Sequence, residues 1–310
     1  MSQFIAKRLL EVVPVVIGIT LVAFAIIHLV PGDPAEVLLG PRATPANVAA
    51  LHERFRLDRP LPEQYWGFVR DAATLSFGES IHFRQSVREV VLPRIAPSAL
   101  LIGYGLVVAL VIAVPLATLS ACRRDRWADH AIRLFTTTTF AMPSFWLGLL
   151  FTMIVSVRLG WLPVSGYGDT AIEHFKGLTL PALTLGLHLA APLLRSLRSN
   201  LIDNLDAEYT EAARARGLSE PRVLFKHVMR NSVISTVTLM AVSVGALLSQ
   251  SVVLENVFSL PGLGSSLVAA VTTRDFPVVQ ALTLLFGLIV VLVSLLTDLL
   301  YALIDPRVRL

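Results

Sequence analysis

The chain has 310 residues, of which 55% are hydrophobic and only 15% are charged, with a formal net charge of +4. Soluble domains carry about 25% charged residues, so this composition excludes an ordinary soluble domain and indicates a membrane protein. The basic residues lie beside apolar runs along the whole chain instead of gathering on one soluble face, which argues against a nucleic-acid partner. The single cysteine, Cys122, excludes an intramolecular disulfide and a CxxC redox motif.

Six runs lack Lys, Arg, Asp and Glu and are long enough to cross a bilayer as helices, since a span needs about 20 apolar residues. They are residues 12–32, 95–122, 134–157, 177–194, 231–254 and 276–297. The first run is too long for the apolar part of a signal peptide and ends without an Ala-x-Ala cleavage site. We therefore predict an all-α membrane protein with six transmembrane helices, the first of them retained.

The distribution of basic residues orients these runs, because short loops rich in Lys and Arg stay in the cytoplasm. With the N-terminus inside, the inner segments hold 15 of the 26 basic residues and have a net charge of +5. The outer segments then have a net charge of −1. We therefore expect both termini in the cytoplasm.

The first outer segment, residues 32–94, is long for a connection and rich in proline. Within it, residues 45–57 and 62–75 have apolar side chains at helical spacing and a proline in the first turn. We expect a small helical layer here, either a docking surface for an external partner or a lid packed over the helix ends. Residues 1–31 would then form the N-terminal segment and first span, and residues 95–310 the core with spans two to six.

The inner loop between the fourth and fifth runs reads DAEYTEAARARG from Asp206 to Gly217. Asp206 is a suitable N-cap, Glu208 and Glu211 lie where the helix dipole favours acids, and Arg214 lies where it favours bases. Gly217 can adopt the left-handed conformation that ends a helix. The loop is therefore predicted to form a short helix outside the bilayer, followed by a second helix that continues into the fifth span.

A short amphipathic helix on the inner surface can pack against lipid or receive another protein. The Glu-Ala-Ala triplet at 211–213, followed by Gly217, resembles the EAA motif with which permeases of bacterial ATP-binding-cassette (ABC) importers dock into a groove of their ATPase subunits. In such permeases this coupling helix passes the movement of the ATPase to the spans. The resemblance implies that the docking residues are Glu208, Glu211, Ala212, Ala213, Arg214 and Gly217.

Five further motifs make the chain similar to the B-type permease subunit of the dipeptide/oligopeptide ABC importer family. They are FIAKRLL at 4–10, PGDPA at 31–35, FSLPGLG at 258–264, RDFPVVQ at 274–280 and DLLYALIDPR at 298–307. The resemblance implies a type I importer permease fold with a long first periplasmic loop, placed in the bacterial cytoplasmic membrane. The implied cargo is a di- or oligopeptide or another solute of this family, which also carries nickel, glutathione and haem-like compounds.

The same resemblance implies a homologous C-type permease, one or two ATPase subunits and an external solute-binding protein as partners. Because the chain has no Walker A motif, we expect ATP and Mg²⁺ on the ATPase subunits, no cofactor on this chain and no enzymatic activity of its own. One departure concerns the bend before the fifth span. His227, Met229 and Arg230 stand where the general pattern has Ile-x-Leu-Pro, and Ser235 stands where family members often have Pro.

Other functional classes have less support in the residues. A secondary transporter would need interrupted helices and buried ion ligands near the midplane, and the runs offer few acids there. A membrane enzyme would need a motif such as His-Glu-x-x-His or Gly-x-Ser-x-Gly, which the sequence lacks. Single histidines without a partner at helical spacing are poor metal sites, so no metal is expected.

Polar residues inside a membrane are costly, so each is a candidate for the translocation path or its gate. The candidates are His188, Gln250 and Glu255. For His188 the alternative is a hydrogen bond between helices, and for Glu255 it is a helix cap.

The fifth run also carries a small-xxx-small stripe, which permits close packing of helices. The stripe comprises Ala241, Gly245 and Ser249. It predicts a packing surface, either within this chain or against the second permease.

Overall fold

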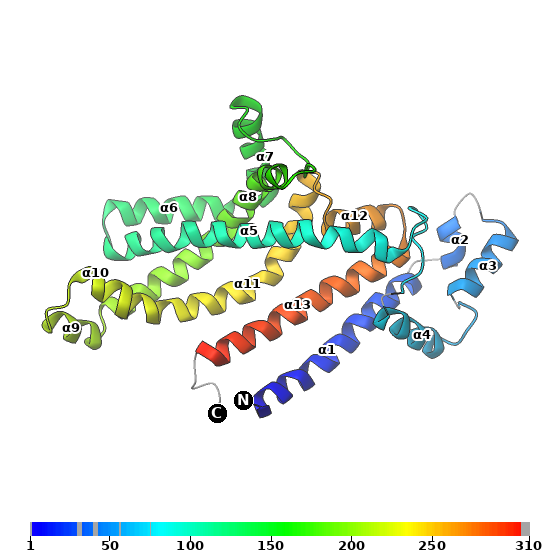
Figure 1. Ribbon diagram of the computed structural model, residues 1–310, viewed down its shortest axis with the longest axis horizontal. Helices are drawn as coiled ribbons and strands as arrows, with labels where there is room; N and C mark the ends of the chain where they lie inside the picture. Colours follow the sequence, from blue (N-terminus) through cyan, green and yellow to red (C-terminus); the bar gives the residue numbers. More distant parts are fainter. Residues whose placement is uncertain (1, 30–32, 40–42, 56, 75, 305–310) are drawn as a thin grey trace. The chain divides into compact units, whose positions relative to one another are not determined.

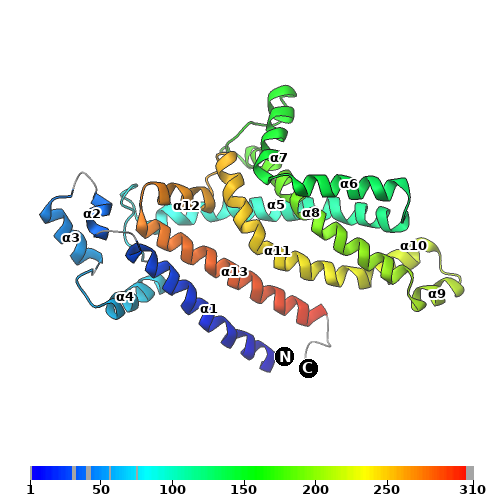
Figure 2. The same ribbon diagram turned by 180° about the vertical axis from the view of Figure 1, so that it is seen from behind.

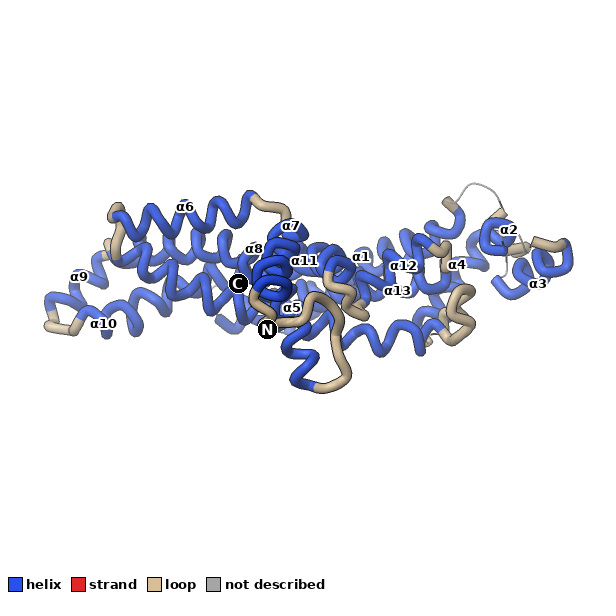
Figure 3. The backbone as a smooth tube through the Cα atoms, turned by 90° about the horizontal axis from the view of Figure 1, so that it is seen from above, coloured by secondary structure: helices blue, strands red, loops and turns tan. Residues whose placement is uncertain are grey.

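The computed structural model describes residues 2–29, 33–39, 43–55, 57–74 and 76–304. Within these ranges every regular element is a helix, apart from one isolated bridge between Glu79 and Ser86 (Figure 3). The all-α prediction is therefore confirmed. The chain divides into two compact units, residues 1–97 with 262–295 and residues 98–261 with 296–310.

The first unit contains the outer segment together with the first and last long helices. Its elements are α1 (Ser2–His28), α2 (Pro34–Leu39), α3 (Pro45–Phe55), α4 (Leu61–Ala73), the start of α5 (Val87–Cys122), α12 (Leu263–Thr272) and most of α13 (Phe276–Ile304). α1 and α13 run side by side (Figures 1 and 2), and Ala23 and Leu284 are buried in one cluster with Ala72 of α4. Apolar packing thus joins the outer segment to both long helices.

The two helices predicted in the outer segment are confirmed as α3 and α4. α4 packs on α1, where the hydroxyl oxygens of Thr20 and Tyr65 lie 2.8 Å apart in a hydrogen bond. α2 was not predicted, because six residues are too few to show a helical period. The packing of α4 agrees with a lid over the helix ends, while α3 keeps most of its residues exposed.

The second unit is built around one central helix. Its elements are the rest of α5, α6 (Trp127–Ala141), α7 (Ser144–Phe151), η2 (Thr152–Arg158), α8 (Ala171–Leu205), α9 (Glu208–Ala215), α10 (Glu220–Arg222), η3 (Val223–Val228) and α11 (Met229–Val257). α8 is buried along most of its apolar window, and Leu185, Leu193 and Leu197 are fully buried. Gly186 lets α5 come close, because a Cβ there would lie 2.6 Å from Cγ1 of Val108.

Among the described residues, five helices are long and apolar enough to cross a membrane: α1, α5, α8, α11 and α13. The third predicted run is not one straight helix, since α6 and the α7–η2 segment are bent by 105°. Met142 is extended, as a residue before proline tends to be, and Pro143 has no N–H with which to continue α6. If the bent pair is one span, the described helices give the six spans that were predicted.

Two predicted features lie outside the described residues. Pro31 and Gly32 of the PGDPA motif do so, as do the last three residues of the DLLYALIDPR motif. The side chain of Ser235 is also outside the description, although its backbone is part of α11.

Candidate functional site

The predicted docking helix forms as α9, at one end of the second unit (Figure 1). Its N-cap is Ala207, so the prediction that Asp206 caps this helix is wrong. α8 runs on to Leu205, and Asp206 serves as its C-cap, with the Asp206 N–H donating to the Ile202 carbonyl at 3.1 Å. The Asp206 carboxylate instead accepts a hydrogen bond from Nη1 of Arg124 at 3.1 Å.

One face of α9 is open to solvent. Its residues follow the i, i+3, i+4, i+7 spacing of a single helix face, and all four are exposed: Glu208, Glu211, Ala212 and Ala215. The opposite face holds Thr210 and Ala213, which are buried in the chain itself. Ala213, which was predicted to be a docking residue, therefore packs inward and lets α9 lie close to η3.

Side-chain hydrogen bonds hold α9 to the two helices that flank it in the sequence. The Thr210 hydroxyl donates to the Asn204 carbonyl at the end of α8 at 2.7 Å. Nε of Arg214 donates to Oε1 of Glu220 at 2.9 Å, and the Asn204 amide donates to Oγ of Ser232 on α11 at 3.2 Å. These bonds tie α9 to α8 and α10, and Asn204 in turn ties α8 to α11.

The left-handed turn predicted at Gly217 is confirmed. Its φ is +79°, in the left-handed region that favours glycine, and its N–H donates to the Arg214 carbonyl at 2.8 Å. The chain then enters α10 and continues through η3 into α11. η3 is a π-helix, a form found often at functional sites, and it contains His227, one of the residues that depart from the family pattern.

A buried ion pair near the inner loop was not predicted. Asp129 of α6 is fully buried and accepts from Nη2 of Arg198 on α8 at 2.6 Å. The same carboxylate accepts from the hydroxyl of Ser120 on α5 and from the N–H of Asp125. These contacts join three helices. No local sequence pattern could predict them, because Ser120 and Arg198 lie 78 positions apart.

The three intramembrane candidates lie in different surroundings. The ring of His188 stacks on that of Phe140 with centroids 4.9 Å apart. Nδ1 of His188 and Oε1 of Gln250 are buried, and neither has a partner among the described residues. The carboxylate of Glu255 is buried and accepts from the hydroxyl of Ser98 at 2.6 Å, which links α11 to α5. Roles in the path or gate remain predictions for all three.

The small-residue stripe on α11 is not closely packed inside this chain. A Cβ on Gly245 would meet no atom within 4 Å, and Ser249 is exposed. Ala241 is only partly buried. Contact with the second permease therefore remains the predicted use of this stripe.

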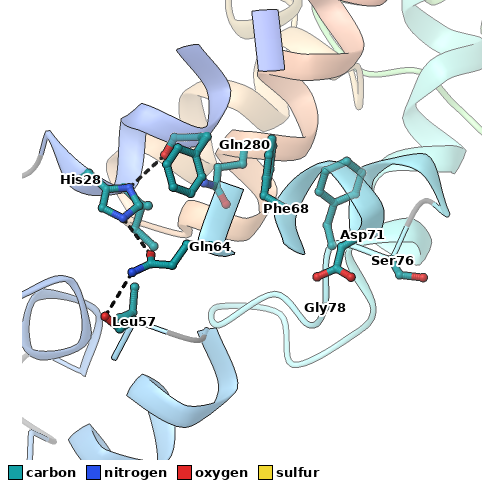
Figure 4. Close-up of a pocket in the computed structure, with 11 residues that line it drawn as sticks. His28, Leu57, Gln64, Phe68, Asp71, Ser76, Gly78 and Gln280 are labelled. Atoms are coloured by element: carbon teal, nitrogen blue, oxygen red, sulfur yellow. Dashed lines mark hydrogen bonds between the residues drawn. The ribbon is translucent and has the colours of Figure 1, made fainter. Parts of the chain in front are cut away.

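The first unit has a small cavity of about 140 Å³ beside the end of α1, lined by both polar and apolar side chains (Figure 4). Nε2 of His28 lies 3.0 Å from Oε1 of Gln64, and the Gln64 amide donates to the Leu57 carbonyl at 3.2 Å. Nδ1 of His28 lies 3.2 Å from the Phe24 carbonyl. His28 thus joins α1 to the outer segment through Nε2, while Nδ1 contacts the preceding turn of α1 itself.

His52 fastens α3 to its neighbours within the outer segment. Its Nδ1 lies 3.0 Å from Oδ1 of Asp58, and its Nε2 lies 2.8 Å from Oδ2 of Asp33. These hydrogen bonds, the one to Asp58 first, raise the pKa of His52 above its ordinary value of 6.5. The protonated imidazole donates from both nitrogens, so the attachment is strongest when His52 is charged.

The outer segment is therefore expected to be more resistant to protease at pH 5.5 than at pH 8.5. A raised folded-state pKa gives a stabilisation that is fully present below the unfolded value and disappears as the pH rises through the folded value. Limited proteolysis of the purified protein across this range would measure the effect. A His52→Gln variant should lose the pH dependence, and an unchanged dependence in that variant would contradict the assignment to His52.

Comparison with protein families identifies matches along almost the whole chain. Residues 113–310 match the model described as the binding-protein-dependent transport system inner membrane component. Residues 1–96 match the N-terminal model of the corresponding membrane component. The interval between the two matches, residues 97–112, lies within α5, which both units share.

Individual relatives match over their full length. The chain is 38% identical over 309 residues to the glutathione transport system permease protein GsiC of Salmonella typhi. It is 37% identical to the protein of the same name from Escherichia coli strain K12, and in both cases 100% of this chain and 99% of the relative are covered.

Two solved structures share the fold. One is an inward-facing MetNI methionine ABC transporter, with a TM-score of 0.59 and 15% identity over 70% of this chain and 96% of that chain. The other is an amino acid ABC transporter with histidines, with a TM-score of 0.53 and 12% identity over 69% of this chain and 93% of that chain. At these identities the likeness concerns the fold alone.

Proposed function

Because the chain belongs to the family of binding-protein-dependent transport system inner membrane components, we propose that it moves a small peptide or a peptide-like solute across the cytoplasmic membrane. It is a permease subunit of an ABC importer, and this family is a transport component rather than an enzyme. The relatives named for glutathione, which is itself a peptide, support this class of solute.

The open face of α9 is the observation that carries the proposed mechanism. Glu208, Glu211, Ala212 and Ala215 offer a surface to an ATPase subunit, with two acids followed by two small side chains. ATP and Mg²⁺ act on that subunit, and its closure pushes α9. Through Thr210 and Asn204 the push reaches α8 and α11, which pack against each other. Alternating access of the path follows from movement of these two helices.

The remaining partners follow from the same role. A second, C-type permease completes the path, one or two ATPase subunits supply the energy, and an external solute-binding protein delivers the solute to the outer segment. This arrangement places α9 and both termini in the cytoplasm, as the distribution of basic residues favours.

Reconstitution of the complete complex tests the proposal. The permeases, the ATPase subunits and the co-purifying solute-binding protein are placed in liposomes, and uptake of labelled glutathione and of a labelled dipeptide is measured. We expect uptake of at least one of them that requires ATP and the solute-binding protein. Uptake that is driven by an ion gradient without ATP would refute the proposal, as would a solute-binding protein that holds only a non-peptide solute.

A Gly245→Leu variant is expected to fold as an isolated subunit but to pair poorly with the second permease. The added side chain meets open space within this chain, yet it would obstruct a helix of another subunit that lies close to the stripe. The yield of the permease pair, relative to the yield of this chain, measures the effect. Val242→Leu, an exposed position one turn away, is the matched control. Normal pairing and uptake in Gly245→Leu would show that the stripe does not contact the second permease.

A further inference from the structure

The central helix α8 has a stripe that its neighbours leave uncovered. Four residues at helical spacing form it, and each is partly or fully exposed: His188, Pro192, Arg195 and Ser199. A guanidinium and an imidazole thus lie on the same face, seven residues or about 10 Å apart along the helix axis.

Phe140 of α6 joins these two basic groups. Its ring centroid lies 4.9 Å from Cζ of Arg195, and the ring stacks at 26° on that of His188, also at 4.9 Å. An aromatic ring stabilises a guanidinium over its face but does not neutralise the charge. In the part of the chain that the structure describes, Arg195 has no acidic partner within ion-pairing distance, and Nδ1 of His188 has no hydrogen bond.

The direction of the Arg195 side chain argues against a lipid headgroup as its partner. The Asp129–Arg198 ion pair sets α6 against α8. Phe140 is 11 residues C-terminal to Asp129 on α6. At 1.5 Å per residue, it therefore lies about 16 Å further along the helix axis, in the direction away from α9. Arg195 lies only one turn from Arg198, so its guanidinium extends away from the α9 end to reach the Phe140 ring.

A lysine or arginine that contacts headgroups bends toward the nearer membrane surface. The Arg195 guanidinium extends the other way, and an unpaired charge at that depth is costly in lipid. An unpaired Arg195 guanidinium is compatible with a water-filled path that carries an anion. Phe140 also lies just before the 105° bend between α6 and α7, where the third span is interrupted.

We propose that Arg195, with Phe140 and His188, forms a site on the translocation path that binds a carboxylate of the solute. This inference rests on the proposed function, because a peptide-like solute carries a carboxylate at its C-terminus. The guanidinium presents two parallel N–H donors that match the two carboxylate oxygens. Phe140 holds the guanidinium in place, and His188 supplies a further polar group one ring away. Arg195 is then a residue that determines specificity for acidic solutes.

Access from water tests the location of the site. The lone cysteine is removed as Cys122→Ala, His188→Cys is introduced, and the complete complex is treated with an anionic and a cationic methanethiosulfonate of similar size. We expect labelling of position 188, with an anion-to-cation rate ratio that falls about fivefold when Arg195→Gln is added, because a nearby unit charge attracts the anionic reagent. Arg133→Gln is the matched control, because Arg133 is also an exposed arginine but belongs to α6. This variant should leave the ratio unchanged.

Absence of labelling, or a ratio that does not respond to Arg195→Gln, would overturn the proposal, since the stripe would then face lipid or the second permease. Retention of bound anionic phospholipid, measured by native mass spectrometry, provides a separate check. A loss of bound lipid in Arg195→Gln without a change in the reagent ratio would assign the guanidinium to a headgroup and equally overturn the site.

Uptake tests the chemistry of the ligand. A dipeptide and its C-terminal amide are delivered by the same solute-binding protein, so any selectivity of that protein is common to all variants. We expect the acid-to-amide uptake ratio to fall about tenfold in Arg195→Gln, as for loss of a charge-assisted pair, and less in Arg195→Lys. An unchanged ratio with ATP-dependent uptake intact would refute the carboxylate site alone. Absence of ATP-dependent uptake in the unmodified complex would refute the proposed function.

Discussion

A complex that carries Glu211→Lys is expected to lose ATP-dependent uptake by about tenfold or more, because a groove complementary to the acids of α9 would meet the new lysine with like charge, which is strongly unfavourable. Glu211 lies at the centre of the open face of α9. Its substitution removes no side-chain hydrogen bond or ion pair within the described chain, so the amount of folded permease should stay close to that of the unmodified protein. Two measurements check the prediction: uptake into liposomes, and the amount of ATPase subunit that co-purifies with the permease.

Asp203→Lys is the matched control for this charge reversal. Asp203 is also an exposed acid near the inner loop, but it belongs to α8 and lies outside the face formed by Glu208, Glu211, Ala212 and Ala215. The control should retain both uptake and the ATPase subunit. If Glu211→Lys retains them as well, the open face of α9 is not the docking surface, and another inner segment must receive the ATPase.

The second large effect concerns the buried ion pair. Asp129→Ala is expected to destabilise the permease by about 3–5 kcal/mol, the usual cost of removing one partner from a buried pair. The Arg198 side chain is only 19% exposed, so its charge would remain largely shielded from water without a counterion. Thermal unfolding of the purified subunit, followed together with the yield of folded protein, would measure the loss.

A double variant separates two contributions to the loss of stability: the cost of leaving one buried charge without its partner, and the stabilisation that the ion pair itself provides. Asp129→Asn with Arg198→Met removes both charges and should be more stable than Asp129→Ala, because no buried charge is then left without its partner. Asp203→Ala, which truncates an exposed acid, is the control. A loss below about 1 kcal/mol in Asp129→Ala would place the pair with ordinary surface ion pairs and contradict its structural role.

The spans and the docking helix could be predicted from sequence because their causes are local. A long apolar run needs a helix to satisfy its backbone in lipid wherever it packs. The left-handed turn at Gly217 likewise depends on that residue and its immediate neighbours. The N-cap was misplaced at Asp206 because the end of α8 could not be located from the pattern, and helix boundaries shift by a residue or two under tertiary packing.

Features that join distant segments could not be predicted in this way. Asp129 looks like any acid beside a short loop until the rotation of α6 turns it toward Arg198. Ala213 belongs to the docking motif, yet it faces the core because α9 lies across η3. The third run has the composition of a span, but the break at Pro143 divides it into two helices of different direction.

By itself, the sequence determined that this protein is an all-α membrane protein with a short helix between its fourth and fifth apolar runs, since hydropathy and helix-end residues act within single segments, and its motifs indicated the permease family. Only the tertiary structure decided which face of α9 is open, how Asp129 and Arg198 join the helices, and that Arg195 lies on a common stripe with His188. The physical reason is that these relations depend on the rotation and register of packed helices, to which residues far apart in the chain contribute together.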